Sequence, residues 1–228
     1  MEKYFKTALY GVLGIFLYFL LYSIEGLPFA LMHVNPNSLP TVIKITYVVT
    51  YQIMMIAIML LLYYNMFKKD IPDMKKNHKK YYKEVFKYYL IAFGIMLISI
   101  GIIILFKGSM ATNEELIRES FKISPFYIYF SGIIFAPIVE EVVFRGCIRK
   151  IVPNKYLFII ISGLVFGFVH VFDYVKTASD FFYLIPYSSL GMAFAYAYYK
   201  TNNILTSMGL HFMHNGVLMS LQFIMLFL

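Results

Sequence analysis

The chain has 228 residues, of which 61% are hydrophobic and only 14% are charged, and its formal net charge is +8. Soluble domains are about 45–50% apolar and about 25% charged, so this composition excludes an ordinary soluble protein and predicts an integral membrane protein. The lysines lie beside apolar segments, where the enrichment of positive residues at the cytoplasmic ends of membrane spans explains them without nucleic acid. Cys147 is the single cysteine, which excludes an intrachain disulfide.

Seven apolar stretches are long enough to cross a bilayer, which takes about 17–25 residues each. They predict one all-α, multi-pass transmembrane helix bundle with about seven spans, six to eight being possible. The spans are expected near residues 5–24, 42–67, 88–106, 125–147, 156–174, 181–199 and 203–226. The first follows Lys3 and Lys6, as a signal peptide would, but no small-residue cleavage site comes after it, so we interpret it as an uncleaved helix.

The loops between these stretches differ in their content of Lys and Arg. Residues 68–87 hold eight lysines against three acidic residues, whereas residues 25–41 hold Glu25 and no Lys or Arg. Because cytoplasmic loops are enriched in Lys and Arg, the amino terminus and the lysine-rich loop are predicted to face the cytoplasm. The loop is most simply an anchor for this topology, although it could also dock anionic lipid or an acidic partner.

Ionisable residues within the spans are concentrated in the second half of the chain. The first three stretches contain almost none, Lys44 near one end being the exception. Residues 1–124 are therefore predicted to form a transmembrane scaffold with the lysine-rich loop. Residues 125–228 are predicted to carry the chemistry, within one compact bundle.

The fourth stretch ends in two adjacent carboxylates and a guanidinium. One unpaired charge in a bilayer costs at least ~2.5 kcal/mol, so three of them are expected to serve chemistry rather than stability. On a helix, Glu141 and Arg145 are four residues apart and can form an ion pair, while Glu140 points about 100° away and stays free. Pro137 is expected to free the carbonyl of Ile133 and to kink the helix before the acidic pair.

The fifth stretch places Gly163, Gly167 and His170 on one helical face. Glycines four residues apart mark close helix contacts, so His170 is predicted to face the interior of the bundle. A lone histidine there could be a satisfied core residue, but its small-residue face and the buried Glu140 favour a functional site. Phe166 lies one turn from His170 and could form a wall of the same pocket.

The last stretch carries a polar stripe, because Ser207, His211 and Asn215 recur every four residues. Such residues could simply join helices, at about 0.6 kcal/mol for each hydrogen bond. Alternatively, they aim hydrogen-bond donors at a reacting group. His214 is expected at a helix interface or behind the site, and not in the chemistry itself.

Together these residues could hydrolyse an amide with water. A buried Glu140 tuned toward neutrality can take a proton from a water that His170 holds. His211 and Asn215 can donate to the oxygen that becomes negative, and losing one such donor typically costs about 3 kcal/mol. No serine or cysteine nucleophile lies beside a base at a recognisable spacing, so attack by water fits better than a covalent acyl-enzyme.

Zinc is an alternative that these residue types leave open. Glu140, His170 and His211 could bind it as a two-histidine, one-carboxylate set. However, no His-Glu-x-x-His helix is present, and asparagine is a poor zinc ligand but a good oxyanion donor.

Three motifs on successive apolar stretches resemble those of the CPBP intramembrane proteases, a family that includes the CAAX prenyl endopeptidases and the bacterial Abi proteins linked to bacteriocin immunity. The motifs are Glu140-Glu141-x-x-x-Arg145, Phe166-x-x-x-His170 and His211-x-x-x-Asn215. The resemblance covers about residues 126–218. The first three spans match only as generic apolar helices.

The resemblance implies an intramembrane protease in which Glu140 is the base that activates water, with His170 beside it. It also implies that His211 and Asn215 stabilise the oxyanion, and that the mechanism depends on glutamate and needs no metal cofactor. The residues with a supporting role are then Glu141, Arg145 and Phe166.

The expected function is cleavage of a membrane-associated protein or peptide near the cytoplasmic side of a bilayer. The substrate could be a prenylated CAAX protein or, since the composition is typical of a bacterial cell-membrane protein, a bacteriocin leader or peptide pheromone. The main alternative is a non-catalytic immunity or partner-scaffold protein with the same fold. A proton-coupled transporter is disfavoured because the two halves show no repeated pair of broken spans.

Overall fold

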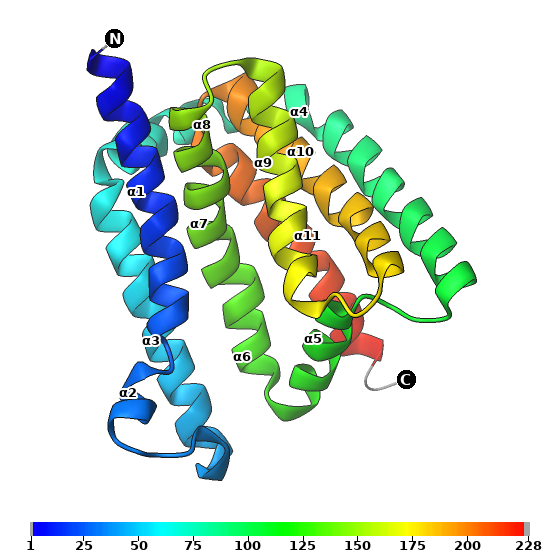
Figure 1. The fold of residues 1–228 in the computed structure, drawn as a ribbon. Helices are drawn as coiled ribbons and strands as arrows, with labels where there is room; N and C mark the ends of the chain where they lie inside the picture. The colour runs from blue at the N-terminus through cyan, green and yellow to red at the C-terminus, as the bar shows by residue number, and fades with distance from the viewer. Residues whose placement is uncertain (1, 226–228) are drawn as a thin grey trace.

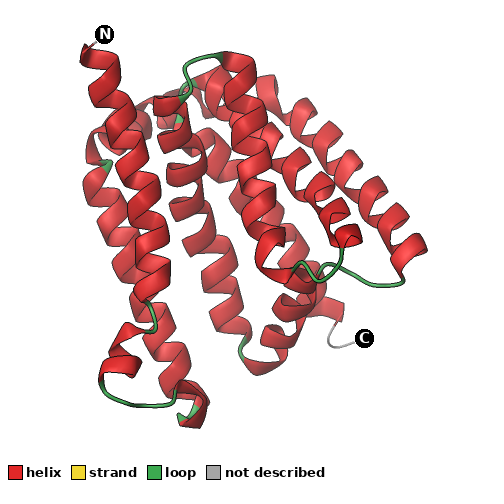
Figure 2. Cartoon of the chain, viewed as in Figure 1, coloured by secondary structure: helices red, strands yellow, loops and turns green. Residues whose placement is uncertain are grey.

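The computed structural model describes residues 2–225, and throughout that range it contains helices and no strand (Figures 1 and 2). The predicted all-α, multi-pass membrane fold is thereby confirmed. The α-helices are α1 (Glu2–Ile24), α2 (Leu27–Leu31), α3 (Thr41–Leu62), α4 (Tyr64–Lys107), α5 (Thr112–Ile123), α6 (Pro125–Tyr129), α7 (Ala136–Glu141), α8 (Ile148–Ile151), α9 (Lys155–Val171), α10 (Leu184–Thr201) and α11 (Ile204–Met225).

Every predicted span coincides with helical structure. The fourth is a rod of consecutive helical segments from Pro125 to Ile151. This rod, α1, α3, α4 and residues 155–174 are long and apolar enough to cross a membrane. The remaining two predicted spans are α10 and α11, which pack against α4 and against each other. The predicted end of the last span at residue 226, and residues 226–228 of the predicted second domain, lie outside the described residues.

The lysine-rich segment 68–87 is not a loop, as the sequence pattern suggested, but the first half of the 44-residue helix α4. Helix α4 contains no glycine before Gly94, and its residues Phe67, Val85 and Tyr89 are buried on the side that faces the bundle. A helix that buries one side against its neighbours gains enough packing to continue through Pro72, despite the hydrogen bond that proline removes.

The helix ends gather at two opposite ends of the bundle (Figure 1). At one end, the Tyr4 hydroxyl donates to the carbonyl of Ile151 (2.7 Å), and the Lys69 amine donates to the carbonyl of Asn202 (3.2 Å). We call this the lysine-rich end, because the first half of α4 lies here. At the opposite end, Lys107 forms an ion pair with Asp180, and α5 lies beside α6.

Helices α9 and α10 approach closely through the glycine face predicted for the fifth span. A Cβ atom on Gly163 would lie 2.9 Å from the backbone nitrogen of Met192 and 3.0 Å from the carbonyl oxygen of Ser188. A Cβ on Gly167 would lie 3.0 Å from the Ser188 nitrogen. Contacts this short leave no room for a side chain, so the predicted close helix contact is confirmed.

Candidate active site

The rod from Pro125 to Ile151 presents the acidic pair between two π-helical segments. These are η2 (Phe130–Phe135) and η3 (Val142–Cys147), and they flank α7, which ends at the pair. A π-helical turn contains one residue more than an α-helical turn, and such turns occur frequently at functional sites. The interruption predicted near Pro137 therefore takes the form of a change in helical register.

This register decides which backbone carbonyl Pro137 leaves free. The backbone N–H of Ala136 donates to Ser131, five residues earlier. In the same pattern the carbonyl of Gly132 would pair with residue 137, but proline has no N–H. The Gly132 carbonyl accepts a hydrogen bond from the Asn215 side chain instead, at 2.7 Å. The sequence predicted that the freed carbonyl would be that of Ile133, because it assumed α-helical pairing over four residues.

Glu141 is the carboxylate that has basic partners, and both of them contact its Oε1. Its side chain is fully buried, and its Oε1 lies 3.0 Å from Nη1 of Arg145 and 2.9 Å from Nδ1 of His211. The Arg145 guanidinium is also fully buried, lies against the rings of Phe166 and Phe194, and donates to the carbonyl of Gly191. The predicted ion pair between Glu141 and Arg145 is thus confirmed.

Glu140, its neighbour, faces a different environment. It is 9% exposed, and its Oε2 has no hydrogen-bond partner among the described residues. The nearest basic group is Nε2 of His170, 3.9 Å away. This distance is too long for a direct hydrogen bond but matches a pair of groups bridged by one water.

The His170 ring is held on both faces and at one nitrogen. Its Nδ1 lies 2.8 Å from the carbonyl oxygen of Phe166, to which it can only donate. The ring contacts that of Phe166 on one side and stacks on Tyr187 on the other, with centroids 4.4 and 5.1 Å away. Because Nδ1 carries the proton in the neutral ring, Nε2 presents a lone pair toward Glu140.

The last helix contributes His211 and Asn215, as the polar stripe predicted. His211 is buried and stacks on Phe194, with an interplanar angle of 18°. Its Nδ1 is occupied by Glu141, which leaves Nε2 for the cavity. His214 lies in the interface with α4, where its Nδ1 is 3.2 Å from the hydroxyl of Tyr89, in agreement with the prediction.

All four predicted catalytic residues line one cavity of about 600 Å³. The supporting Phe166 lines it as well. The cavity continues along the second half of α11, past Leu218 and Gln222, to α5 at the end opposite the lysine-rich end. Its wall is mostly apolar, and its polar lining includes the four predicted catalytic residues and also Glu114 and Arg118 of α5.

The zinc alternative can be compared with this geometry. Within residues 2–225, no group of three or more His, Cys, Asp and Glu side chains is arranged to hold a metal ion. Of the three candidate ligands, Glu140 and His170 face each other, whereas His211 turns its Nδ1 to Glu141. The side chains as placed do not fit a zinc site.

Glu140 and His170 lie at different distances along their helices from the turn between α8 and α9. Counted from the turn between α8 and α9, Glu140 lies eleven residues down one helix and His170 fifteen residues down the other. At 1.5 Å per residue this is about 16 Å against about 22 Å. The side chains nevertheless meet, since Nε2 of His170 lies 3.9 Å from Oε2 of Glu140.

Sequence reasoning missed the residues behind His170. Tyr187 of α10 stacks on its ring, and the Tyr187 hydroxyl bonds to Glu114 (3.2 Å) and Asn113 (3.3 Å) of α5. The available signal was the polar run at residues 187–189 inside an otherwise apolar helix. Its partners on α5 could not be inferred, because the mixed charges of that helix are typical of any exposed segment.

Comparison with known proteins gives a family match and a relative, each covering part of the chain. Residues 122–217 match the family described as Type II CAAX prenyl endopeptidase Rce1-like. A Bacillus subtilis (strain 168) protein named "Putative membrane peptidase YdiL" is 30% identical over 118 residues. That alignment covers 50% of this chain and 45% of the relative, so the match spans about half the length of each.

No solved structure matches the chain. The segment matched by the family contains Glu140, His170, His211 and Asn215. The family match and the relative support the resemblance predicted from the three motifs: residues 122–217 of this multi-pass membrane protein are similar to the family described as Type II CAAX prenyl endopeptidase Rce1-like.

Proposed function

We propose that this chain is an intramembrane endopeptidase that hydrolyses a peptide bond of a membrane-associated protein or peptide. One observation carries the proposal: Glu140 and His170 face each other across 3.9 Å in a cavity that also presents His211 and Asn215. The similarity to a family of CAAX prenyl endopeptidases supports a hydrolase over a non-catalytic scaffold.

The first step is activation of a water between Glu140 and His170. Both the carboxylate and the Nε2 lone pair accept hydrogen bonds, so the water donates one hydrogen to each and turns its own lone pair toward the cavity. Glu140 takes one proton as the oxygen attacks the substrate carbonyl carbon. Such a positioned base typically contributes about 10²–10⁴-fold to the rate.

The oxyanion is then stabilised by His211 and Asn215. Glu141 accepts a hydrogen bond from Nδ1 of His211 and so directs Nε2 to the cavity. In the imidazolium form Nε2 donates to the oxyanion, and Asn215 contributes the amide hydrogen that Gly132 does not occupy. The C–N bond breaks as Glu140 returns its proton to the leaving nitrogen, and the products are an amine and a carboxylic acid, which then loses its proton to solvent.

The substrate route follows from the shape of the cavity. Leu97 and Leu221 line it and are also exposed on the surface of the bundle, so the cavity reaches the lipid-facing side. We expect an apolar substrate segment to enter there, in the half of the bundle away from the lysine-rich end. With the amino terminus in the cytoplasm, this differs from the expected cleavage near the cytoplasmic side.

The test is cleavage by the full chain in proteoliposomes. The substrates are a prenylated CAAX peptide and an unmodified apolar leader peptide of the same length, because these are the two substrate classes. Glu140→Gln should lower kcat by at least about 100-fold on whichever peptide is cleaved. The control is Glu25→Gln, which removes a carboxylate outside the cavity and should retain activity.

Cleavage that persists in Glu140→Gln would contradict the proposal and favour a scaffold or immunity protein. Metal dependence is tested separately. Activity should survive prolonged treatment with a strong chelator, and a loss that added zinc restores would replace the glutamate mechanism by a metal-dependent one.

A further inference from the structure

The lysines of the first half of α4 all lie on one face of the helix. At 100° per residue, the eight fall within an arc of about 140°. All are exposed, and we call this arc the lysine face; it consists of Lys68, Lys69, Lys75, Lys76, Lys79, Lys80, Lys83 and Lys87. Lysines four residues apart, such as Lys79 and Lys83, repel each other on a helix, so an anionic surface would relieve the strain of this arrangement.

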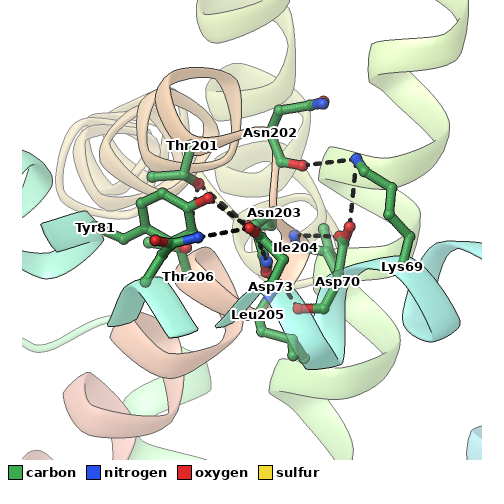
Figure 3. A network of polar contacts seen from close by, with 11 residues as sticks. Lys69, Asp70, Asp73, Tyr81, Thr201, Asn202, Asn203, Ile204, Leu205 and Thr206 are labelled. Atoms are coloured by element: carbon green, nitrogen blue, oxygen red, sulfur yellow. Dashed lines mark hydrogen bonds and ion pairs between the residues drawn. The ribbon is translucent and has the colours of Figure 1, made fainter. Parts of the chain in front are cut away.

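Two of the three acidic residues of the same segment, Asp70 and Asp73, are engaged by groups other than the lysine face. Asp70 is 1% exposed, and its Oδ2 accepts a hydrogen bond from the backbone of Ile204. Asp73 accepts hydrogen bonds from Asn203 and Tyr81, as Figure 3 shows. These carboxylates are used inside the bundle, where they hold α4 to the turn before α11.

The lysine face is therefore almost free of internal compensation. Among residues 2–225, Lys69 is the one member with a carboxylate within ion-pair distance, at 3.5 Å from Oδ1 of Asp70. The charge of the other seven lysines is available to something outside the described chain.

The position of the lysine face along α4 indicates what that partner is. On the carboxyl-terminal side of Lys87, the same face of α4 carries Leu90, Leu97 and Leu105, whose side chains are 49%, 50% and 85% exposed. Side chains of this kind on a membrane span face the acyl chains of lipid. The lysines nearest to them consequently lie at the depth of the headgroups.

Tyrosines mark the same depth. The rings of Tyr88 and Tyr196 meet at 4.4 Å between centroids, and the Lys87 amine lies 4.8 Å from the Tyr88 ring. Tyrosine is enriched at membrane–water interfaces, where its ring is apolar and its hydroxyl is hydrated.

We infer that the lysine face of α4 binds the phosphate headgroups of anionic phospholipids, with Lys80, Lys83 and Lys87 as its closest contacts. These three lie within about 11 Å of one another along the helix axis, at the border with the lipid-facing leucines. The more distant lysines add a long-range attraction that salt screens over about 8–10 Å. The inference is independent of the proposed protease activity.

The test uses the absence of tryptophan from the chain. Phe86→Trp places a single fluorophore on the lysine face, at a position that is 39% exposed. The full chain is reconstituted in vesicles that contain brominated phosphatidylglycerol or brominated phosphatidylcholine, and quenching gives the relative affinity of the two lipids. A preference for phosphatidylglycerol of about fivefold or more is expected at low salt, and high salt should reduce it.

Three variants on the tryptophan background identify the cause. Lys80→Gln, Lys83→Gln and Lys87→Gln together should abolish the preference, whereas the three corresponding Lys→Arg changes should keep it. The matched control, Lys44→Gln with Lys122→Gln and Lys176→Gln, removes the same charge away from the lysine face and should leave the preference intact. Equal quenching by both lipids, or a preference that survives the first triple variant, would overturn the inference and leave an acidic polypeptide as the partner to seek.

Discussion

The two halves of the chain both supply helices apolar enough to cross a membrane, but they use that character differently. In α1, α3 and α4, 22%, 17% and 22% of the most apolar window is buried; in residues 125–151 and 155–174 the shares are 44% and 33%. Among the described residues, Asp70 is the one buried polar side chain of the first half, and it bonds to the second. The apolar helices of the first half thus expose most of their surface, whereas those of the second half bury a larger share of it against other helices.

The largest effect should come from removing a charge that has partners only in the second half. Glu141→Gln leaves the fully buried Arg145 without its counter-ion, which should lower the free energy of unfolding by about 3–5 kcal/mol. Glu25→Gln in the first half should change it by less than about 0.5 kcal/mol. Unfolding exposes the buried Cys147, so labelling of its thiol during a detergent titration measures both.

Adding Arg145→Met to Glu141→Gln should recover part of the lost stability, because no uncompensated charge remains buried. If Glu141→Gln lowered the free energy of unfolding no more than Glu25→Gln does, the proposed difference between the two halves would be contradicted.

The next effect concerns close packing. Gly163→Ala forces a Cβ against the backbone of α10, and overpacking of this kind typically costs about 1–3 kcal/mol. Gly94→Ala is the matched change in the first half, where a Cβ would meet nothing within 4 Å. It should be neutral or should stabilise by up to about 1 kcal/mol, because glycine is the poorer helix former. Equal destabilisation by the two would show that α4 is packed as tightly as α9.

A smaller effect is expected where the first half reaches into the site. Tyr187→Phe keeps the ring against His170 but removes the hydroxyl that bonds to Glu114 and Asn113. A net hydrogen bond is worth about 0.5–1.5 kcal/mol, so kcat/KM should fall by about three- to tenfold. The control is Tyr183→Phe, which removes a hydrogen bond to Ser109 and should leave kcat/KM nearly unchanged. Equal losses would mean that Tyr187 acts on the fold and not through His170.

The smallest effect is expected from breaking the ion pair between Lys107 and Asp180, which joins the two halves at the end opposite the lysine-rich end. The Lys107 amine and the backbone amides of Thr177 and Lys176 lower the pKa of Asp180 below its usual value. A lowered folded-state pKa stabilises the fold above the unfolded pKa of about 3.9, and this contribution is lost as the pH falls through the folded value. Lys107→Gln should therefore destabilise by up to about 1 kcal/mol at pH 7 and by less below pH ~3, in the same thiol-labelling titration.

The sequence predicted the helices well because long apolar stretches have few alternatives in a membrane. The lysine-rich segment was wrongly predicted to be a loop, since its helical character depends on packing of Phe67 and Val85 against neighbours distant in sequence. The sequence correctly predicted that Glu141, and not Glu140, pairs with Arg145, because helical spacing alone separates the two glutamates by about 100°.

The contacts behind the site could not be read in the same way. Stacking of Tyr187 on His170 depends on the close approach of α9 and α10, and its hydrogen bonds depend on where α5 folds back. The freed carbonyl was placed one residue away from the observed Gly132, because a π-helical register leaves no simple pattern in the residues.

Pro137 acts on Asn215 from a neighbouring helix by withholding a donor. An alanine in its place would restore a backbone N–H one π-helical turn after Gly132. The carbonyl of Gly132 would then have two competing hydrogen-bond donors, this N–H and the Asn215 side chain. The amide of Asn215 would no longer be held in a single orientation in the cavity. A residue usually regarded as a helix breaker thus serves here as a remote restraint on a side chain that it does not need to touch.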